Sequence, residues 1–537
     1  MLTLLLIFFP AIRDMAPCAV GVSQSAPAAT RQADTHFLES LLDQVDLSKD
    51  PTVRVFLRLK IAAYLRKDTV TRLTPQHVAA AALADLHAHE EEIPPLYAEQ
   101  FRGELLIILR GKASAGALIP SGENGSLGRS SLQLARSLIL QEGKADDALG
   151  IARGNISGSK SLDALMVPFL HLLDRSGPAQ VPTLLDEIMS AEESRPGFLS
   201  ASDFFTLKHL FLRRETPPAL QRRYLKALVK AADAVRDRST SIVDLVAILT
   251  NVLPEVEKMS PDLYAAATHR RNNLLTQLPA EALERLAANK RVSESADPLA
   301  QSLAEADATN SQSLRDELLT NAARLALERG QTRTAVELVD GLRGRNADKD
   351  LWCDQFIGGA VSSALDKRNV GDARYAALYI RAVAIRSAAL QQIALNLQKS
   401  GDAASARETL KSALKLVESS DDTVCKATAL LDLSETFMKM NEEMAGGVMS
   451  AAVKTINRWG TMMQDTSDAD ARLRNAEDAM KLAYRLGPAF QALAALDEFM
   501  ALALAKEIRP QGLRLVAMLG AHTGSVPAER SRRTPLK

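Results

Sequence analysis

The stretch ALNLQKSGDAASARETLKSA, residues 394–413, contains the end of one candidate helix, a glycine turn and the start of a second helix. One alanine stands seven residues before Gly401 and another stands five residues after it. Gly330 and Gly371 have alanines at the same two offsets. Glycine favours the left-handed conformation that ends a helix, and alanine allows two helices to cross closely. The three copies therefore predict successive antiparallel helical hairpins.

The apolar residues around the three glycines extend this pattern. The alanine pairs are Ala323/Ala335, Ala364/Ala376 and Ala394/Ala406. Around Gly401 the apolar positions are Leu390, Ile393, Ala394 and Leu397 before the turn, and Ala406, Leu410 and Ala413 after it. A fourth, weaker copy turns at Asn441. Together the copies predict an all-α superhelical array between residues 313 and 505.

The pattern resembles the tetratricopeptide repeat. That family places a large apolar residue and, four residues later, a small one on its first helix, and Ala, a bulky residue and Ala on its second. The turn-to-turn intervals here are 41, 30 and about 40 residues, whereas the family repeat has about 34. Glu418 stands where the family has its closing proline. The resemblance implies a divergent α-α superhelix that binds a protein or peptide on its concave face.

Composition narrows the class of protein. The chain has 537 residues, 47% of them hydrophobic and only 4% aromatic, which favours helices packed through small side chains. Lys+Arg and Asp+Glu both number 65, so the chain has no basic excess typical of a nucleic-acid binder. The 3 cysteines form no disulfide framework. Cys353 and Cys425 could pair if their helices meet, but we favour two buried free thiols.

The N-terminus resembles a secretory signal peptide. The apolar run 2–9 is too short to span a bilayer, and the residues up to 33 are rich in Ala, Ser, Pro and Gln. No Lys or Arg precedes the run, and Pro10 ends it early. We expect a leader and disordered linker over residues 1–33 and export to the periplasm or exterior. A mis-assigned start would instead leave the protein cytoplasmic.

Glycine, proline and helix-capping residues along the chain predict how the rest of it is divided into helical regions and loops. We expect a helical region over 34–110, a glycine- and serine-rich loop after it, an irregular helical region over 131–291, and a flexible tail over 522–537. Asp50, Thr74 and Ser260 each precede a proline and are typical helix N-caps. The glycine- and proline-free segment 372–399 permits one long helix or two helices with a turn near Ala384.

Few sequence motifs indicate a phosphate-binding, metal-binding or catalytic site. Residues 154–161 superficially match a phosphate-binding loop, but the spacing is one residue short and a helix precedes it. His87 and Glu91 share a helical face, which supplies two metal ligands where zinc requires three or four. The possible acid–base pairs are Asp203 with His209 and His171 with Asp174. None of these patterns is specific, so we assign no catalytic, cofactor-binding or metal-ligating residue.

The sequence therefore favours a non-catalytic scaffold that mediates protein–protein interaction and lacks an integral membrane span. We expect the partner to contact one polar face of the first helices of successive hairpins. The candidates are Gln391, Leu395, Gln398, Asp432 and Thr436. Two alternatives remain: an exported all-α enzyme, such as a helical toroid acting on polysaccharide, and a structural envelope-associated protein.

Overall fold

The structure is a computed structural model of the 537-residue chain. It describes residues 28–48, 50–65, 74–109, 132, 135, 136, 139, 145–234, 239–344, 346–421, 423–440, 442–462 and 469–525. Throughout these ranges the regular elements are helices, without a strand. Residues 1–27 of the predicted leader, the loop 111–130 and the turn at Asn441 lie outside the described residues. The prediction of a disordered linker up to residue 33 is wrong for residues 28–33, which begin a helix.

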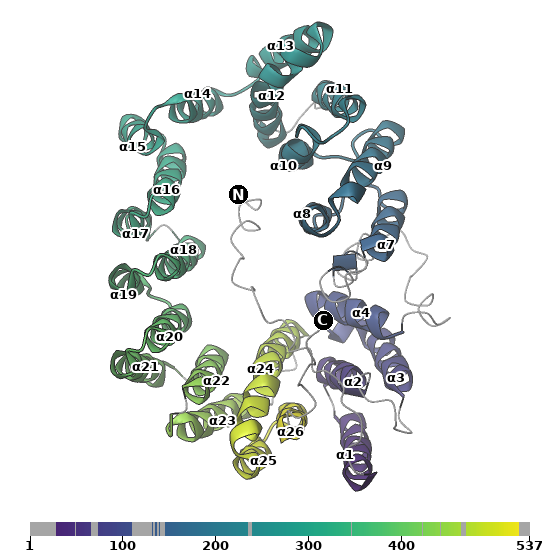
Figure 1. The fold of residues 1–537 in the computed structure, drawn as a ribbon, viewed down its shortest axis with the longest axis vertical. Coiled ribbons are helices and arrows are strands. Elements are labelled where there is room, and N and C mark those ends of the chain that lie inside the picture. Colours follow the sequence, from purple (N-terminus) through teal and green to yellow (C-terminus); the bar gives the residue numbers. More distant parts are fainter. Residues whose placement is uncertain are drawn as a thin grey trace, which may run out of the picture. The chain divides into compact units, whose positions relative to one another are not determined.

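The described part of the chain forms two compact units (Figure 1). Unit 1 runs from residue 99 to residue 289, and unit 2 combines the described residues up to 98 with those from 290 onward. None of the described helices is both long enough and apolar enough to cross a bilayer.

Unit 1 is a helical bundle with an aromatic core. Its helices are α4 (Pro95–Leu109), which begins before the unit, α7 (Ala145–Gly158), α8 (Met166–Ser176), η3 (Pro178–Gln180), α9 (Val181–Ser194), α10 (Ala201–Phe211), α11 (Pro218–Ala234), α12 (Ser239–Met259), α13 (Pro261–Leu275) and α14 (Ala280–Glu294). Tyr224 is buried between Phe204 and Phe211, and its hydroxyl donates to the Phe204 carbonyl at 2.6 Å. Ser200 starts α10 with a capping box that includes Asp203.

Unit 2 contains the predicted array. Its N-terminal helices are α1 (Ala28–Asp46), α2 (Pro51–Leu65), α3 (Pro75–Ala88) and η2 (Glu90–Glu92). The later helices are α15 (Pro298–Ala308), α16 (Gln312–Glu328), α17 (Thr332–Asp340), α18 (Ala347–Asp366), α19 (Val370–Tyr379), α20 (Val383–Lys399), α21 (Ala403–Glu418), α22 (Val424–Lys439), α23 (Ala445–Met462), α24 (Ala469–Leu496), α25 (Glu498–Glu507) and α26 (Gln511–Ser525).

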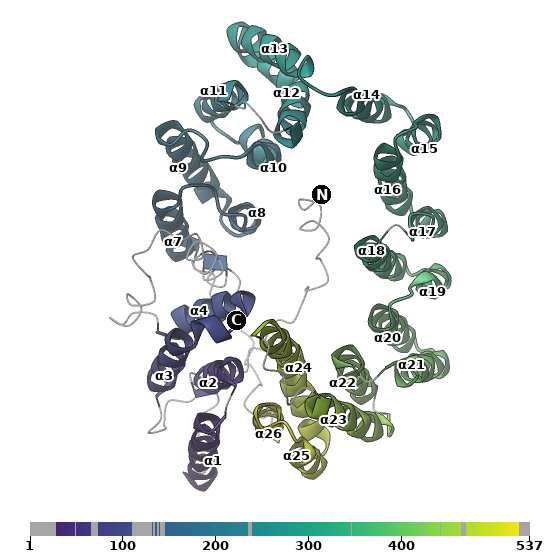
Figure 2. The same cartoon turned by 180° about the vertical axis from the view of Figure 1, so that it is seen from behind.

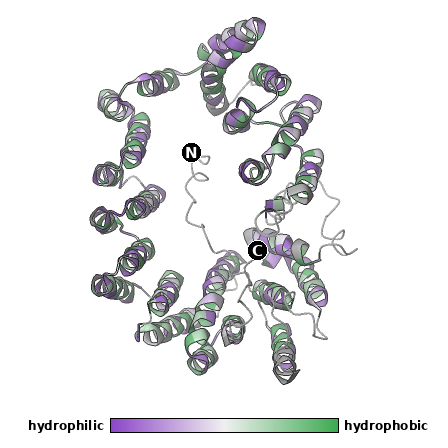
Figure 3. Cartoon of the chain, viewed as in Figure 1, coloured by the Kyte–Doolittle hydropathy of each residue, from purple (hydrophilic) through white to green (hydrophobic). Residues whose placement is uncertain are grey.

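The array has two rows of antiparallel helices. Hairpins pair α16 with α17, α18 with α19, α20 with α21 and α22 with α23. We call α16, α18, α20, α22 and α24 the first row, and α17, α19, α21 and α23 the second row. The first row lies on the inner side of the curve that these helices follow (Figures 1 and 2). Their mixed hydropathy (Figure 3) is typical of amphipathic helices packed on one side.

Two of the three glycines predicted to form hairpin turns are confirmed in that role. Gly330 and Gly401 have φ of 80° and 89°, the left-handed conformation that ends α16 and α20. In the middle hairpin that conformation belongs to Arg368, with φ of 58°, and Gly371 lies inside α19. The predicted register of this hairpin is therefore wrong by three residues. With Arg368 as the turn, the intervals become 38 and 33 residues, closer to a regular repeat.

The segment 372–399 forms two helices, α19 and α20, which separate between Tyr379 and Val383. The break depends on Asp354 of α18, whose carboxylate accepts hydrogen bonds from the backbone N–H groups of Arg381 and Ala382 at 2.9 and 2.8 Å. Arg343 donates to the same carboxylate at 2.7 Å and to the Tyr379 carbonyl at 2.9 Å. A buried ion pair thus satisfies the backbone groups that a helix end leaves without partners.

The N-terminal helices of unit 2 pack against its C-terminal helices. α2 contacts both α24 and α26, and α1 contacts α26. The Phe56 ring lies 4.8 Å from the Tyr484 ring, and the Phe37 ring stacks on His522 at 4.1 Å. Because α26 continues to Ser525, the prediction of a flexible tail from residue 522 is wrong for its first four residues. Residues 526–537 lie outside the described part.

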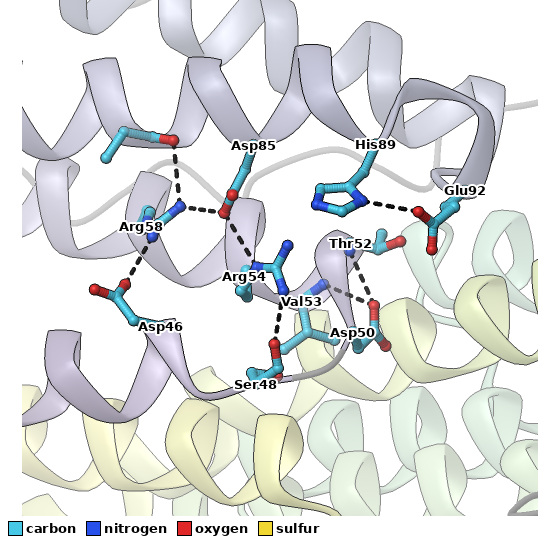
Figure 4. Close-up of polar contacts among 11 residues, drawn as sticks. Asp46, Ser48, Asp50, Thr52, Val53, Arg54, Arg58, Asp85, His89 and Glu92 are labelled. Carbon is cyan, nitrogen blue, oxygen red and sulfur yellow. Dashed lines mark hydrogen bonds and ion pairs between the residues drawn. The ribbon is translucent and has the colours of Figure 1, made fainter.

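A polar network joins α1, α2 and α3 (Figure 4). Arg54 and Arg58 of α2 both form ion pairs with Asp85 of α3, and Arg58 also reaches Asp46 of α1 at 2.7 Å. Asp50 caps α2 by accepting from the N–H groups of the two residues that follow Pro51, and burial raises the pKa of its carboxyl. These charges are matched within the network, so we assign them a structural role.

Helices α24 and α26 approach each other through glycine. A Cβ atom added at Gly520 would lie 2.4 Å from the Gly487 carbonyl oxygen, and one added at Gly524 would lie 2.2 Å from the Gln491 carbonyl oxygen. The two backbones are therefore in direct contact along one turn of α26. Any larger side chain at Gly520 or Gly524 requires the helices to separate.

The hairpin crossing provides a first test. Ala394 and Ala406 are both fully buried, as predicted. Ala394→Leu is expected to overpack the crossing of α20 and α21 and to lower the free energy of unfolding by about 1–3 kcal/mol. Ala388→Leu, at an exposed position of the same helix, is the control and should change stability by less than about 0.5 kcal/mol. Urea unfolding followed by circular dichroism measures both, and equal effects would contradict this packing.

Candidate functional site

Only some of the residues predicted to form a partner-binding face lie at the surface. Gln398 is exposed, and Leu395 and Asp432 are half-buried. Gln391 and Thr436 are only 7% and 5% exposed, so their prediction as surface residues is wrong. The Thr436 hydroxyl donates to Gln391 Oε1 at 2.8 Å, and Gln391 Nε2 donates to the Ser387 hydroxyl at 3.2 Å. These side chains join α20 to α22 in the interior.

The exposed side of α20 contains Gln392, the residue that follows the buried Gln391. Ala388, Gln392 and Lys399 are exposed at helical spacing, whereas Gln391 points toward α22. An isolated polar pattern could not distinguish the two positions, because glutamine occupies both. What distinguishes them is the hydrogen bond of Gln391 to Thr436, which lies 45 residues later in the sequence.

Polar contacts connect successive first-row helices. The Ser362 hydroxyl of α18 donates to Gln392 Oε1 of α20 at 2.9 Å. The buried Thr436–Gln391 bond joins α20 to α22. The Asp432 carboxylate of α22 lies 3.5 Å from Arg485 Nη1 of α24. Each pair joins neighbouring hairpins, so these contacts set the register of the row.

The side of the first row that faces away from the second row is a mixed polar surface, which we call the first-row face. Its exposed or half-buried residues repeat at helical spacing on α18, α20 and α22. They are Leu351, Gln355, Ser362, Ala388, Gln392, Leu395, Cys425, Thr428, Asp432, Glu435 and Lys439. Leu351 is the large apolar residue of this face that is most exposed, at 48%.

The charges on this face are local pairs of opposite sign. Lys439 Nζ lies 2.7 Å from Glu435 Oε1 on the same helix. Desolvation raises the pKa of Asp432, Arg485 opposes this shift, and Glu435 adds to it. The face therefore offers hydrogen-bonding groups and partly compensated charges, which suit recognition of a polar partner surface.

The phosphate-loop-like segment ends a helix. Residues 154–158 belong to α7, and Arg195 donates to the carbonyl oxygens of Ile156, at 2.7 Å, and of Ser159. The backbone groups presented here are thus carbonyl acceptors with a cationic partner. A phosphate-binding loop wraps the anion with backbone N–H donors at a helix N-terminus, so this segment does not form such a loop.

The two aspartates predicted to pair with histidines have other polar partners in the structure. Asp174 forms an ion pair with Arg213, and Asp203 caps α10. His171 stacks on His209, with ring centroids 4.8 Å apart. Desolvation and then His209 lower the pKa of His171, and Asp174 opposes this shift. His89, near the predicted His87–Glu91 pair, lies 2.8 Å from Glu92. Among the described residues no three His, Cys, Asp or Glu side chains form a metal-binding group.

The two described cysteines are free thiols. Cys353 is buried, its thiol donates to the Val339 carbonyl at 3.4 Å, and burial raises its pKa. Cys425 is exposed on the first-row face, so the prediction of two buried thiols is wrong for this residue. Cys425 is the second residue of α22 and lies on the exposed side of that helix, whereas Cys353 lies on the buried side of α18.

The fold defines an all-α helical-repeat protein. No family model matches the chain, and no curated protein matches it. One solved structure that matches is described as a circular tandem repeat protein with novel repeat topology and enhanced subunit contact surfaces. It is 14% identical, the match covers 92% of this chain and 96% of that one, and the TM-score is 0.13.

Proposed function

We propose that the protein is a non-catalytic scaffold that binds a protein or peptide partner on the first-row face. The observation that supports this is that different residues of the first row hold its helices together and face the solvent. Ser387, Gln391 and Thr436 hold the helices together from inside, whereas Gln355, Ala388 and Cys425 are exposed and make no interhelical polar contact. Exposed residues repeated across three hairpins provide an extended surface that the fold does not require.

We further propose that the array is a divergent relative of the tetratricopeptide repeat. The burial of Ala323, Ala335, Ala394 and Ala406 at the hairpin crossings supports this. The Arg368 turn and the irregular intervals are departures from the family pattern. The export of the protein also remains our proposal, supported by the apolar run 2–9.

A matched pair of variants tests the scaffold function. The face variant Gln355→Arg/Ala388→Arg/Cys425→Arg places one charge on each of α18, α20 and α22. The control Thr334→Arg/Leu378→Arg/Ser412→Arg places the same charges at exposed positions of the second row, on α17, α19 and α21. Affinity capture from an extract of the native cells, with quantitative mass spectrometry, should recover a partner with the unmodified chain and the control.

The face variant should lose that partner by about tenfold or more, because three uncompensated charges would be buried in the interface. Thermal unfolding should remain within a few degrees for both variants, since exposed substitutions rarely change stability by more than about 0.5 kcal/mol. Equal recovery with all three proteins, or turnover of a small molecule by the purified chain, would refute the proposal.

A further inference from the structure

An apolar patch is exposed in unit 2 where α24 ends and α25 begins. Phe499 is 87% exposed, and Leu496, three residues earlier, is 59% exposed. Met500 and, from the turn before α23, Met444 are exposed as well. A Cβ atom added at Gly446 would lie 2.7 Å from Met500 Sδ, so the starts of α23 and α25 are in contact. A group of exposed apolar side chains, unlike a single one, marks an interaction surface.

Helix α25 has one buried side and one open side. Its buried side packs among α23, α24 and α26. The open side carries Phe499, Leu502, Ala503 and Lys506, at the i, i+3, i+4 and i+7 spacing of one helical face. We call these four residues the α25 face. Its middle position is an alanine, and a small residue there lets a second helix approach closely.

The two ends of the α25 face carry opposite charges. Glu498 lies at the N-terminal end and Lys506 at the C-terminal end, and both are exposed. Neither forms an ion pair with another described residue. At about 100° per residue, Glu498 and Lys506 lie on one side of the face, whereas Glu507 lies on the opposite side, with Met500. The charges of the face are therefore complementary to those of an antiparallel copy of itself.

We propose that the α25 face binds the α25 face of a second copy of this chain, antiparallel about a two-fold axis between Leu502 and Ala503. Each Phe499 then packs against Ala503 and the methylene groups of Lys506 of the second copy. Each Glu498 meets Lys506 of the second copy, since a two-fold axis applies the same contact twice. A parallel pair of helices would instead place Glu498 against Glu498, and an anionic membrane would meet that carboxylate with like charge.

This inference goes beyond the scaffold function, because the α25 face shares no residue with the first-row face. Helix α25 has only 10 residues, so the area that it buries is at the low end of the range for specific interfaces. We therefore expect a reversible equilibrium between monomer and dimer, and not a permanent dimer.

Sedimentation velocity of the purified full-length chain over a wide range of concentrations tests the dimer. Phe499→Glu should raise the dissociation constant of the dimer by about tenfold or more, because it buries a charge at the centre of the contact. The control is Leu378→Glu on α19, where the leucine is 65% exposed, and it should change that constant by less than about twofold. Both positions are exposed, so thermal unfolding by circular dichroism should match that of the native chain.

Charge exchange tests the antiparallel arrangement. Glu498→Lys and Lys506→Glu should each weaken self-association by about threefold or more at low ionic strength, because like charges then meet across the axis. An equimolar mixture of the two variants should associate within about twofold of the native affinity, since both charged pairs of the mixed dimer are again of opposite sign. The double variant Glu498→Lys/Lys506→Glu should recover for the same reason.

A native chain that stays monomeric at every concentration would overturn the proposal, and so would a Phe499→Glu variant that dimerises as the native chain does. A mixture that associates no better than its two components would show that Glu498 and Lys506 do not meet between copies. Binding of a monomeric native chain to phosphatidylglycerol vesicles, abolished by Phe499→Glu, would assign the patch to a membrane instead. None of these results bears on the capture experiment with the first-row face, so the two proposals fail separately.

Discussion

Asp354→Ala is expected to lower the free energy of unfolding of unit 2 by about 3–5 kcal/mol. The side chains of Asp354 and Arg343 are only 5% and 3% exposed. Removing the carboxylate leaves the Arg343 guanidinium without this buried partner and removes the acceptor of two backbone N–H groups at the start of α20. Urea unfolding followed by circular dichroism measures the loss.

The control is Asp366→Ala, at an exposed position near the end of the same helix, with an expected change of less than about 0.5 kcal/mol. Hydrogen exchange gives a local readout, because the amides of Arg381 and Ala382 should lose their protection in Asp354→Ala before the rest of α19 and α20. If Asp354→Ala unfolds at the same urea concentration as the native chain, the ion pair does not define the break.

Gly520→Ala is expected to destabilise unit 2 by about 3 kcal/mol, and Gly520→Ala/Gly524→Ala by more. The atom in the way is a backbone carbonyl oxygen of α24, so no side chain can rotate to make room. Helix α26 must move away from α24, and its contacts with α1 and α2 weaken as a result. Differential scanning calorimetry of the purified chain should show a lower melting temperature.

Gly447→Ala supplies the matched control for this second prediction. Gly447 also lies within a helix, α23, but a Cβ atom there would meet nothing within 4 Å. Alanine has a higher helix propensity than glycine, so this variant should keep or raise stability by up to about 1 kcal/mol. Similar melting temperatures for Gly447→Ala and Gly520→Ala would show that α24 and α26 do not touch as described.

Local sequence signals predicted the hairpins where the chain's own chemistry sets the turn. Gly330 and Gly401 adopt the left-handed conformation, and Thr74 and Ser260 accept the capping hydrogen bonds expected of residues before a helical proline. The turn of the middle hairpin was not predicted correctly, because its left-handed residue is Arg368 and not a glycine. Alanines at the expected offset from Gly371 then gave a plausible but shifted register.

Features set by residues distant in sequence could not be decided from the sequence. For the segment 372–399 the sequence left one helix or two open, and the structure has two. The break contains neither glycine nor proline, and Asp354, which binds its backbone, lies 27 residues before Arg381. On the candidate face, Gln391 and Gln392 differ only in which neighbour each meets. One is bonded to Thr436 in the interior, and the other accepts from Ser362 at the surface. Such assignments require the three-dimensional positions of both partners.

The contact of α2 with α24 and α26 has a consequence for biosynthesis. A ribosome adds roughly 5–20 residues per second, so α2 emerges between about twenty seconds and a minute and a half before α26. During that interval Phe56 and Val53, which finally pack against Tyr484 and Gly512, lack their partners. The earliest helices of the chain thus complete their burial last, and a nascent chain stalled before residue 511 would display this apolar surface to chaperones and proteases.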